Sequence, residues 1–162
     1  MTQIPYHVGI LVPDIRAAMA RFQRELGYTF NEPVIMRSPD VEDRIAGVRG
    51  AMEIPVAYTR EGVPHIELIE FVGAGVFGPE RCEGLHHLGM WESDTDARLA
   101  AFEASGAQID AVFHAPDGSA AAFYVSPRDG EGGSRTEYVS ERQRPRLEAW
   151  FRTGVLAPSP AN

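Results

Sequence analysis

The first strongly patterned segment of the chain is HVGILV at 7–12, a run of β-branched and apolar residues. Such a run predicts a strand that is buried on both faces. Asp14 follows where a helix N-cap belongs, and apolar residues recur at helical spacing from Ile15 to Phe22. Gly27 stands where a C-cap glycine would end this predicted helix.

Residues 28–53 contain prolines and glycines among charged residues, and this composition predicts a loop. The segments IPVAYT at 54–59 and HIELIEF at 65–71 are then predicted to be two strands joined by a turn. The following stretch, GAGVFGPERCEG at 73–84, has the composition of a linker. It formally spells GxGxxG, but no helix pattern follows it, so we do not expect a dinucleotide site there.

The first pattern then returns, because HLGMWESD at 87–94 can be laid over HVGILVPD at 7–14 with histidine first and aspartate last in both. Helical spacing resumes and ends at Gly106. The strands predicted after this second helix span 109–114, 120–126 and 135–140. The chain is therefore expected to contain two copies of one strand–helix–strands unit.

This repeat divides the chain into two modules, a connection between them and a C-terminal stretch. The predicted boundaries are 1–72, 73–84, 85–141 and 142–162. In the last of these, apolar residues from Leu147 to Val155 have the spacing of a short amphipathic helix, which is expected to pack on the domain. The terminal APSPAN is expected to be a disordered tail.

Each module carries one histidine in its first strand and one glutamate in its last strand. These residues are His7 and Glu67 in the first module and His87 and Glu137 in the second. Side chains alternate between the two faces of a strand, so the aliphatic neighbours of each histidine are expected to pack against the helix. This leaves both histidines on the opposite, concave face. By the same alternation His86 is expected to face the other way.

Pairing of the two modules would bring these four side chains together. An inward-facing carboxylate on a strand is costly unless a cation or a proton neutralises it. Two imidazoles and two carboxylates form a site suited to one divalent metal ion such as Zn, Ni, Co, Mn or Fe(II). Four protein ligands leave positions open on a six-coordinate ion, where water or substrate oxygens could bind.

The composition narrows the function classes. The chain has 23 acidic and 15 basic side chains, a formal charge of −8, and no cluster of Lys and Arg, so neither nucleic acid nor an anionic membrane is an expected partner. The single cysteine, Cys82, excludes an internal disulfide, and no apolar run is long enough to predict a membrane span. We therefore expect a cytoplasmic protein that acts on a small molecule.

The motifs HVGILVPD, PHIELIE, GLHHLGMWESD and RTEYVSE resemble the vicinal-oxygen-chelate superfamily, which includes glyoxalases, bleomycin-resistance proteins and dioxygenases. The resemblance covers nearly all of residues 5–141 and is to the branch that contains methylmalonyl-CoA epimerase. It implies an α+β fold in which paired βαβββ modules form a cup. It also implies His7, Glu67, His87 and Glu137 as metal ligands, and a homodimer, as in many members.

The resemblance further implies a type of chemistry. In such families the metal acts as a Lewis acid that stabilises the enediolate formed when a proton leaves the carbon beside the chelating oxygens. A ligand carboxylate can move that proton; Glu137 is the candidate here, with Glu67 as its partner. Proton return on the opposite face gives epimerisation, and return at the neighbouring carbon gives isomerisation. The expected function is a metal-dependent epimerase, isomerase or lyase.

Two other functions stay open. Some members of the superfamily are metal-free proteins that sequester an antibiotic in the cup, although four ligand-type residues would be unnecessary there. A glyoxalase I-like lyase is the second, but the bacterial enzyme typically carries an arginine for glutathione four residues after the first histidine, where this chain has Leu11. The epimerase branch in turn usually has glutamine at the position of Glu67.

Three further residues are candidate substrate contacts. His65, Trp91 and Arg135 have the same strand alternation as the predicted metal ligands next to them, and so are expected on the inward face. Arg135 could meet an anionic group of the substrate.

Overall fold

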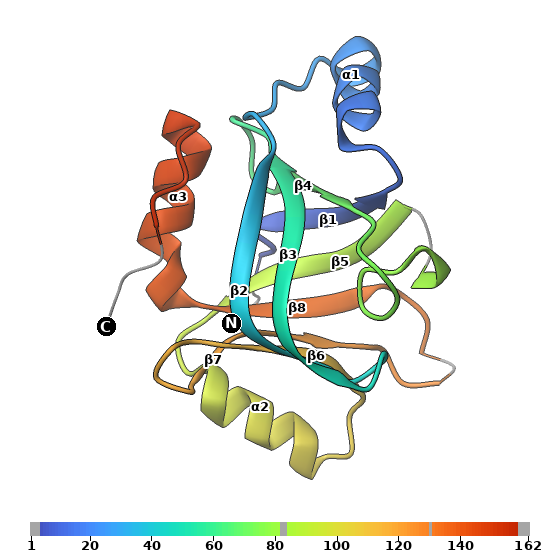
Figure 1. The fold of residues 1–162 in the computed structure, drawn as a ribbon, viewed down its shortest axis with the longest axis vertical. Coiled ribbons are helices and arrows are strands. Elements are labelled where there is room, and N and C mark those ends of the chain that lie inside the picture. Colours follow the sequence, from blue (N-terminus) through green and yellow to red (C-terminus); the bar gives the residue numbers. More distant parts are fainter. Residues whose placement is uncertain (1–3, 82–83, 130, 159–162) are drawn as a thin grey trace.

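The protein is represented by a computed structural model that describes residues 4–81, 84–129 and 131–158. Cys82 and the last residues of the predicted tail, 159–162, lie outside the described residues. Strands of the described chain close into one barrel in the order β1-β4-β3-β2-β6-β7-β8-β5 (Figure 1). No helix in these described parts is long and apolar enough to cross a membrane.

The elements of the two modules follow the same order along the chain. The first module contains β1 (His7–Val12), α1 (Ile15–Leu26), β2 (Val34–Asp43), β3 (Val48–Tyr58) and β4 (His65–Glu70). The second contains β5 (Gly84–Glu92), α2 (Thr95–Ala104), β6 (Ile109–His114), β7 (Ala120–Val125) and β8 (Arg135–Ser140). The helix α3 (Arg144–Thr153) follows, and short 3-10 turns at Pro79–Arg81 and Glu141–Gln143 precede β5 and α3. The predicted α+β fold of paired βαβββ modules is confirmed.

Equivalent caps fix where α1 and α2 begin. The Asp14 carboxylate accepts a hydrogen bond from the Ala17 amide at 2.9 Å, and Asp94 accepts one from Ala97 at 3.0 Å. Each bond satisfies an amide that the first helical turn leaves without an intrahelical partner. Gly27 ends α1 with φ 75°, a left-handed conformation that costs glycine little. Because the same cap is repeated, α1 and α2 begin in the same way after the equivalent strands β1 and β5.

The prediction of a loop over 28–53 is wrong, because most of that segment forms β2 and the first half of β3. Pro39 lies within a register shift between Ser38 and Val41, where a strand accommodates a residue that cannot donate a backbone hydrogen bond. Side chains of β2 are only partly covered over most of its length, so its hydrophobic alternation is weak in the sequence. The loop-like composition of this segment is therefore the reason that the sequence did not predict β2.

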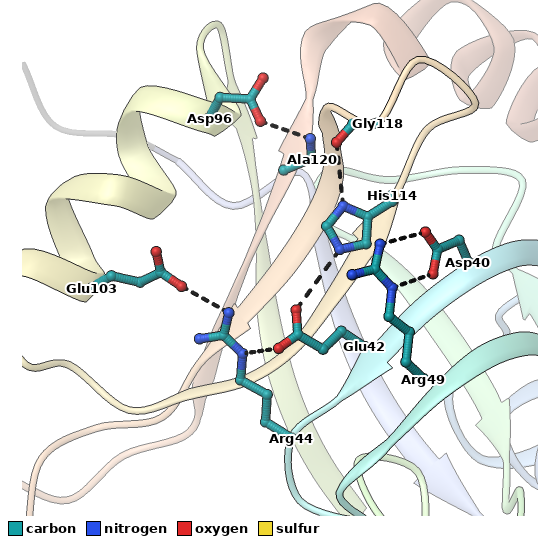
Figure 2. Close-up of polar contacts among 9 residues, drawn as sticks. All are labelled: Asp40, Glu42, Arg44, Arg49, Asp96, Glu103, His114, Gly118 and Ala120. Carbon is teal, nitrogen blue, oxygen red and sulfur yellow. Dashed lines mark hydrogen bonds and ion pairs between the residues drawn. The ribbon is translucent and has the colours of Figure 1, made fainter.

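Two seams join the modules within this single chain. At one seam β1 pairs antiparallel with β5, and at the other the end of β2, Val41 to Asp43, pairs with β6. Figure 2 shows charged side chains at the second seam: Arg44 binds Glu42 of its own module at 2.9 Å and, across the seam, Glu103 of α2 at 2.7 Å. Exposed pairs of this kind contribute little individually, so strand pairing and burial close the barrel.

The C-terminal helix α3 is fastened to the side of the barrel, away from α1 and α2 (Figure 1). Leu147, Trp150 and Phe151 are buried, and Trp150 has no exposed surface. The buried Asn31 side chain donates hydrogen bonds to the carbonyl oxygens of Trp150 at 3.0 Å and Phe151 at 3.3 Å. These carbonyls belong to the last turn, where oxygens have spare acceptor capacity; that of Trp150 also accepts from the Gly154 amide at 2.8 Å. Helix α3 is thus part of the core.

We predict that Trp150→Ala lowers the free energy of unfolding by about 3–5 kcal/mol, because it leaves a large cavity beneath α3. The indole Nε1 has no hydrogen-bond partner among the described atoms, so the loss comes from packing, and Trp150→Phe should cost clearly less. Urea denaturation followed by circular dichroism measures both. The control Val155→Ala, at a side chain that is 70% exposed, should change little. Equal stability of Trp150→Ala and the wild type would contradict this role of α3.

Candidate metal centre

The register of four strands brings His7, Glu67, His87 and Glu137 together at the inner surface of the barrel. Across the seam between β1 and β5, His7 lies opposite Gly89 and His87 lies opposite Gly9. Within the first module Gly9 is in register with Glu67. Within the second, Gly89 is in register with Glu137. The two halves therefore contribute the same three residue types in the same relative places.

All four side chains are almost completely withdrawn from solvent. The Nε2 atoms of His7 and His87 are 2.6 Å apart. Glu67 Oε2 lies 3.3 Å from His7 Nε2 and 3.2 Å from His87 Nε2. Glu137 Oε2 lies 3.2 Å and 3.4 Å from the same two atoms. One donor atom from each residue thus falls in a group whose members all lie within 4.8 Å of one another.

This donor set fits a divalent metal ion. Atoms that are each about 2.1 Å from one ion lie about 3.0–3.4 Å apart in octahedral or tetrahedral shells, and the nitrogen–oxygen distances fall in this range. Glu67 Oε2 is buried without a hydrogen-bond partner among the described atoms, although a buried carboxylate oxygen normally has one. A bound cation would satisfy that oxygen. Mixed imidazole and carboxylate donors suit Zn, Ni, Co, Mn or Fe(II).

Without a metal ion the imidazoles favour the ionised form of the two carboxylates, and the carboxylates favour protonation of the imidazoles. Burial alone would lower the pKa of His7, but its ion pairs with Glu67 and Glu137 raise it to about 9. Against burial, the same carboxylates raise the pKa of His87. The pKa values of Glu67 and Glu137 are lowered, since the two imidazoles outweigh the effect of burial. At neutral pH both carboxylates are therefore ionised, and a proton on His7 offsets part of their charge.

A tyrosine stands in register with each glutamate. Tyr58 of β3 is opposite Glu67, and Tyr124 of β7 is opposite Glu137. The Tyr58 hydroxyl donates to Glu67 Oε1 at 2.5 Å, which leaves Oε2 to face the imidazoles. Burial and then the nearby carboxylates raise the pKa of both tyrosines well above the usual value, so both remain protonated donors. Tyr58 thereby fixes how Glu67 presents its oxygens, and Tyr124 lies beside Glu137.

The expectation that His86 faces away from His87 is wrong. A β-bulge opposite Gly9 and Ile10 interrupts the alternation of β5, and the Nδ1 atoms of His86 and His87 lie 2.9 Å apart. His86 Nε2 is 2.7 Å from the carbonyl oxygen of Val76. Burial and the neighbouring His87 lower the pKa of His86 to about 3, so its ring is neutral.

This contact sets the tautomers of the two adjacent rings. Only an N–H can donate to the Val76 carbonyl, so the proton of His86 is on Nε2 and its Nδ1 accepts from His87 Nδ1–H. The lone pair of His87 Nε2 is then free to bind a metal ion. The other ligand lacks this support, since His7 Nδ1 has no hydrogen-bond partner among the described atoms. The two halves of the site are therefore not equivalent.

Gly9 and Gly89 provide the space that the two imidazole rings occupy. A Cβ atom built at Gly9 would overlap the ring of His87, and one built at Gly89 would overlap the ring of His7. Neither glycine has a positive φ, so the requirement is for space and not for backbone conformation. Close packing of each ring on the opposite strand defines where its nitrogen points.

A cavity of about 430 Å³ opens beside the two glutamates and extends to the N-terminal part of α3. Glu67 and Glu137 line it together with Tyr6, Tyr58 and Tyr124. Its walls are otherwise mainly apolar, formed by Ile54, Val56, Ile69, Phe77, Phe113, Val139 and Leu147. This is the size and character of a small-molecule site.

The three predicted substrate contacts lie outside this cavity lining. The His65 ring packs on Phe151 and its Nδ1 is 2.8 Å from the Thr59 carbonyl oxygen. Trp91 stacks on Tyr6 with ring centroids 3.7 Å apart. Arg135 donates to Asp110 at 2.5 Å, so its charge is already paired. Contact of these residues with a substrate stays a prediction.

Sequence reasoning missed the tyrosines, the role of the glycines and the contact of His86. The repeat contained a signal for two of these. Glycine stands two residues after the histidine in both HVG and HLG, and tyrosine stands near the end of both strands that precede the glutamate strands. The bulge that turns His86 toward His87 has no such counterpart, because Tyr6 occupies the equivalent place before His7.

Comparisons with known proteins agree with this architecture. The family model of the glyoxalase/bleomycin resistance protein/dioxygenase superfamily matches residues 6–123. Among solved structures, a Streptomyces coelicolor methylmalonyl-CoA epimerase in complex with 2-nitronate-propionyl-CoA is similar, with a TM-score of 0.57, 21% identity and coverage of 86% of this chain and 94% of that chain. Methylmalonyl-CoA epimerase from Mycobacterium tuberculosis has a TM-score of 0.53, 22% identity and coverage of 85% and 87%. At this identity the likeness shows the fold. No curated protein matches the chain.

We predict that Gly9→Ala and Gly89→Ala each weaken divalent metal binding by about tenfold to hundredfold, because the added methyl group displaces an imidazole ring. Competition titration of Zn²⁺ against a chelator measures the affinity, and circular dichroism checks folding. Gly50→Ala is the matched control, since a Cβ there meets nothing within 4 Å. Unchanged affinity in both site variants would show that the rings do not hold the ion.

We also predict that metal binding releases protons at neutral pH. The raised pKa of His7, about 9, keeps its proton on the metal-free site, and a ligand imidazole must lose that proton. Apparent affinity should therefore rise as pH increases toward 9. In the metal-free protein, the stability from protonated His7 is complete below its unfolded pKa of about 6.5 and is lost as pH rises through about 9. Calorimetry in buffers of different ionisation enthalpy measures the release; none at neutral pH would contradict this protonation state.

Proposed function

Because the chain belongs to the glyoxalase/bleomycin resistance protein/dioxygenase superfamily, we propose that it is a metal-dependent enzyme that moves a proton at a carbon beside a carbonyl group of a small substrate. One observation carries this proposal. Four buried donor atoms from His7, Glu67, His87 and Glu137 converge, and the two glutamates also line a mainly apolar cavity. Such a site combines cation binding with room for an organic molecule.

A divalent ion bound there would act as a Lewis acid and stabilise negative charge that develops on substrate oxygens. The protein supplies the proton transfer. Glu67 and Glu137 both line the cavity, and their lowered pKa values keep them ionised and able to accept a proton at neutral pH. Because the walls are mainly apolar, electrostatic interactions with the reacting group are screened less there than in bulk water.

Glu137 is the carboxylate that we assign to proton removal, with Glu67 as its partner. The side chain of Glu137 is 12% exposed and that of Glu67 is 7% exposed, so Glu137 is the more accessible of the two. Glu67 Oε1 is also held by the Tyr58 hydroxyl. Proton return by the second carboxylate on the other face of the carbon would give epimerisation, and return by Glu137 at a neighbouring carbon would give isomerisation.

The similar solved structures are compatible with an epimerase. One of them is a methylmalonyl-CoA epimerase in complex with methylmalonyl-CoA and NH4+, with a TM-score of 0.58, 20% identity and coverage of 86% of this chain and 95% of that chain. This supports methylmalonyl-CoA as the first compound to test on this chain. Glu67 stands where that branch usually has glutamine, so other substrates with neighbouring oxygens belong in the same test.

The alternative of metal-free sequestration is favoured by the apolar walls of the cavity. It leaves the buried Glu67 Oε2 without a hydrogen bond among the described atoms, where its contacts are ion pairs with His7 and His87. Metal content separates the two functions: one bound ion per chain in gently purified or reconstituted protein supports an enzyme, and failure to bind any divalent ion supports sequestration.

We predict that the metal-loaded protein exchanges a substrate proton for deuterium in D₂O, and that Glu137→Gln slows this exchange by about 100-fold or more. Glutamine keeps an oxygen donor but cannot act as a base at neutral pH. Proton NMR would follow methylmalonyl-CoA, α-hydroxyketones and the hemithioacetal of glutathione and methylglyoxal. Glu53→Gln, at an exposed glutamate of β3, is the control. Exchange that is unaffected by Glu137→Gln would remove Glu137 from the proposed role.

A further inference from the structure

Arg146 of α3 is a cation in the wall of the same cavity that Glu67 and Glu137 line. Two other arginines of this wall already have carboxylate partners: Arg37 binds Glu53 at 2.7 Å, and Arg142 binds Asp117 at 3.1 Å. Among the described residues, no carboxylate lies within ion-pairing distance of Arg146. Among the described ion pairs, Arg146 is therefore the arginine of this wall that is not paired with a carboxylate.

Among the described residues, one backbone contact sets the orientation of the Arg146 guanidinium. Its Nε donates to the carbonyl oxygen of Ala157 at 2.7 Å. Among the described atoms no hydrogen bond engages the two terminal NH₂ groups, which are the pair that can bind an oxyanion side by side. Arg146 is also partly buried, and burial lowers its pKa. Partial removal of a guanidinium from water without a counter-charge is costly, and an anionic ligand would offset that cost.

The helix that carries Arg146 is fixed to the barrel. Leu147, the next residue, is buried and lines the cavity, and Trp150 is fully buried one turn later. Asn31 holds the last turn through two carbonyl oxygens. A rigid support keeps an arginine in place before the ligand arrives, so less conformational entropy is lost on binding.

We propose that Arg146 binds an oxyanionic group, a carboxylate or a phosphate, at the end of the substrate remote from the oxygens that react. This inference rests on the proposed function and names the substrate class for the same site. The substrate would have oxygen donors at one end for the His7–Glu67–His87–Glu137 site, an apolar middle against the cavity walls and an anion at α3. Bulk attraction cannot supply this recognition, because the chain carries a net charge of −8.

Alkyl hydroxamates test this arrangement, because the hydroxamate chelates a metal ion through two neighbouring oxygens. Three sets of matched chain lengths would end in a carboxylate, a phosphonate or a methyl group, and calorimetry on the Zn²⁺-loaded full chain would measure affinity. At the best length an anionic end should improve binding by about tenfold to hundredfold over methyl. Arg146→Met should abolish that gain and leave the methyl-ended compound unaffected, and Arg146→Lys should keep part of it.

Arg152→Met is the control, since it removes the same charge from an exposed position of α3 outside this cavity. It should keep the full gain. Whichever end, carboxylate or phosphonate, gives the larger gain in affinity over methyl identifies the oxyanion that Arg146 binds. The proposal is overturned if anionic ends give no gain at any length, or if the gain survives in Arg146→Met.

A second measurement does not depend on the metal ion. Metal-stripped protein would be titrated with anilinonaphthalenesulfonate and with its uncharged counterpart N-phenylnaphthylamine, and fluorescence would report binding. The sulfonate should bind about tenfold more tightly than its counterpart in the wild type and in Arg152→Met, but not in Arg146→Met. If no hydroxamate binds but the metal-stripped protein still prefers the sulfonate, the result would contradict the proposed function and not the role of Arg146. If the wild type does not prefer the sulfonate but still binds methyl-ended hydroxamates, the result would contradict the role of Arg146 and not the proposed function.

Discussion

The structure depends on confining two carboxylates and two imidazoles, with donor atoms within 4.8 Å of one another, inside a closed barrel. Charges withdrawn from water are costly unless each has a compensating partner. The surrounding residues provide that compensation in part: Tyr58 binds one oxygen of Glu67, and His86 orients His87. Glu67 Oε2 keeps no hydrogen-bond partner among the described atoms. A cation at the centre would complete the arrangement, and this links the fold to the proposed chemistry.

Duplication of the module accounts for the symmetric part of the site. Differences between the two modules make the surroundings of the site asymmetric. Each module places a histidine over a glycine of the other module, so neither half can position its ring alone. The differences lie outside the donors. His86 supports only one histidine, and α3 covers one side of the barrel and brings Arg146 to the cavity. A symmetric centre with an asymmetric surrounding can distinguish the two ends, and the two faces, of a substrate.

Much of this arrangement could be predicted from the sequence, because the repeat of HVGILVPD in HLGMWESD carries both the strand and the cap that aims the helix. Strand alternation then predicted which histidines face inward. The same rule failed for His86, since a bulge adds a residue and resets the alternation. Strand β2 was missed because Pro39 and exposed charges hide its pattern. The position of Arg146 at the cavity depends on packing between α3 and the barrel, which no local pattern encodes.

The most direct test of the central claim is a crystal soaked with Zn²⁺ or Co²⁺, with anomalous difference density recorded at the absorption edge of that metal. The account predicts one strong peak per chain, about 2.0–2.2 Å from His7 Nε2, His87 Nε2 and one oxygen each of Glu67 and Glu137. A site without a peak, or a peak held by other residues, would contradict it.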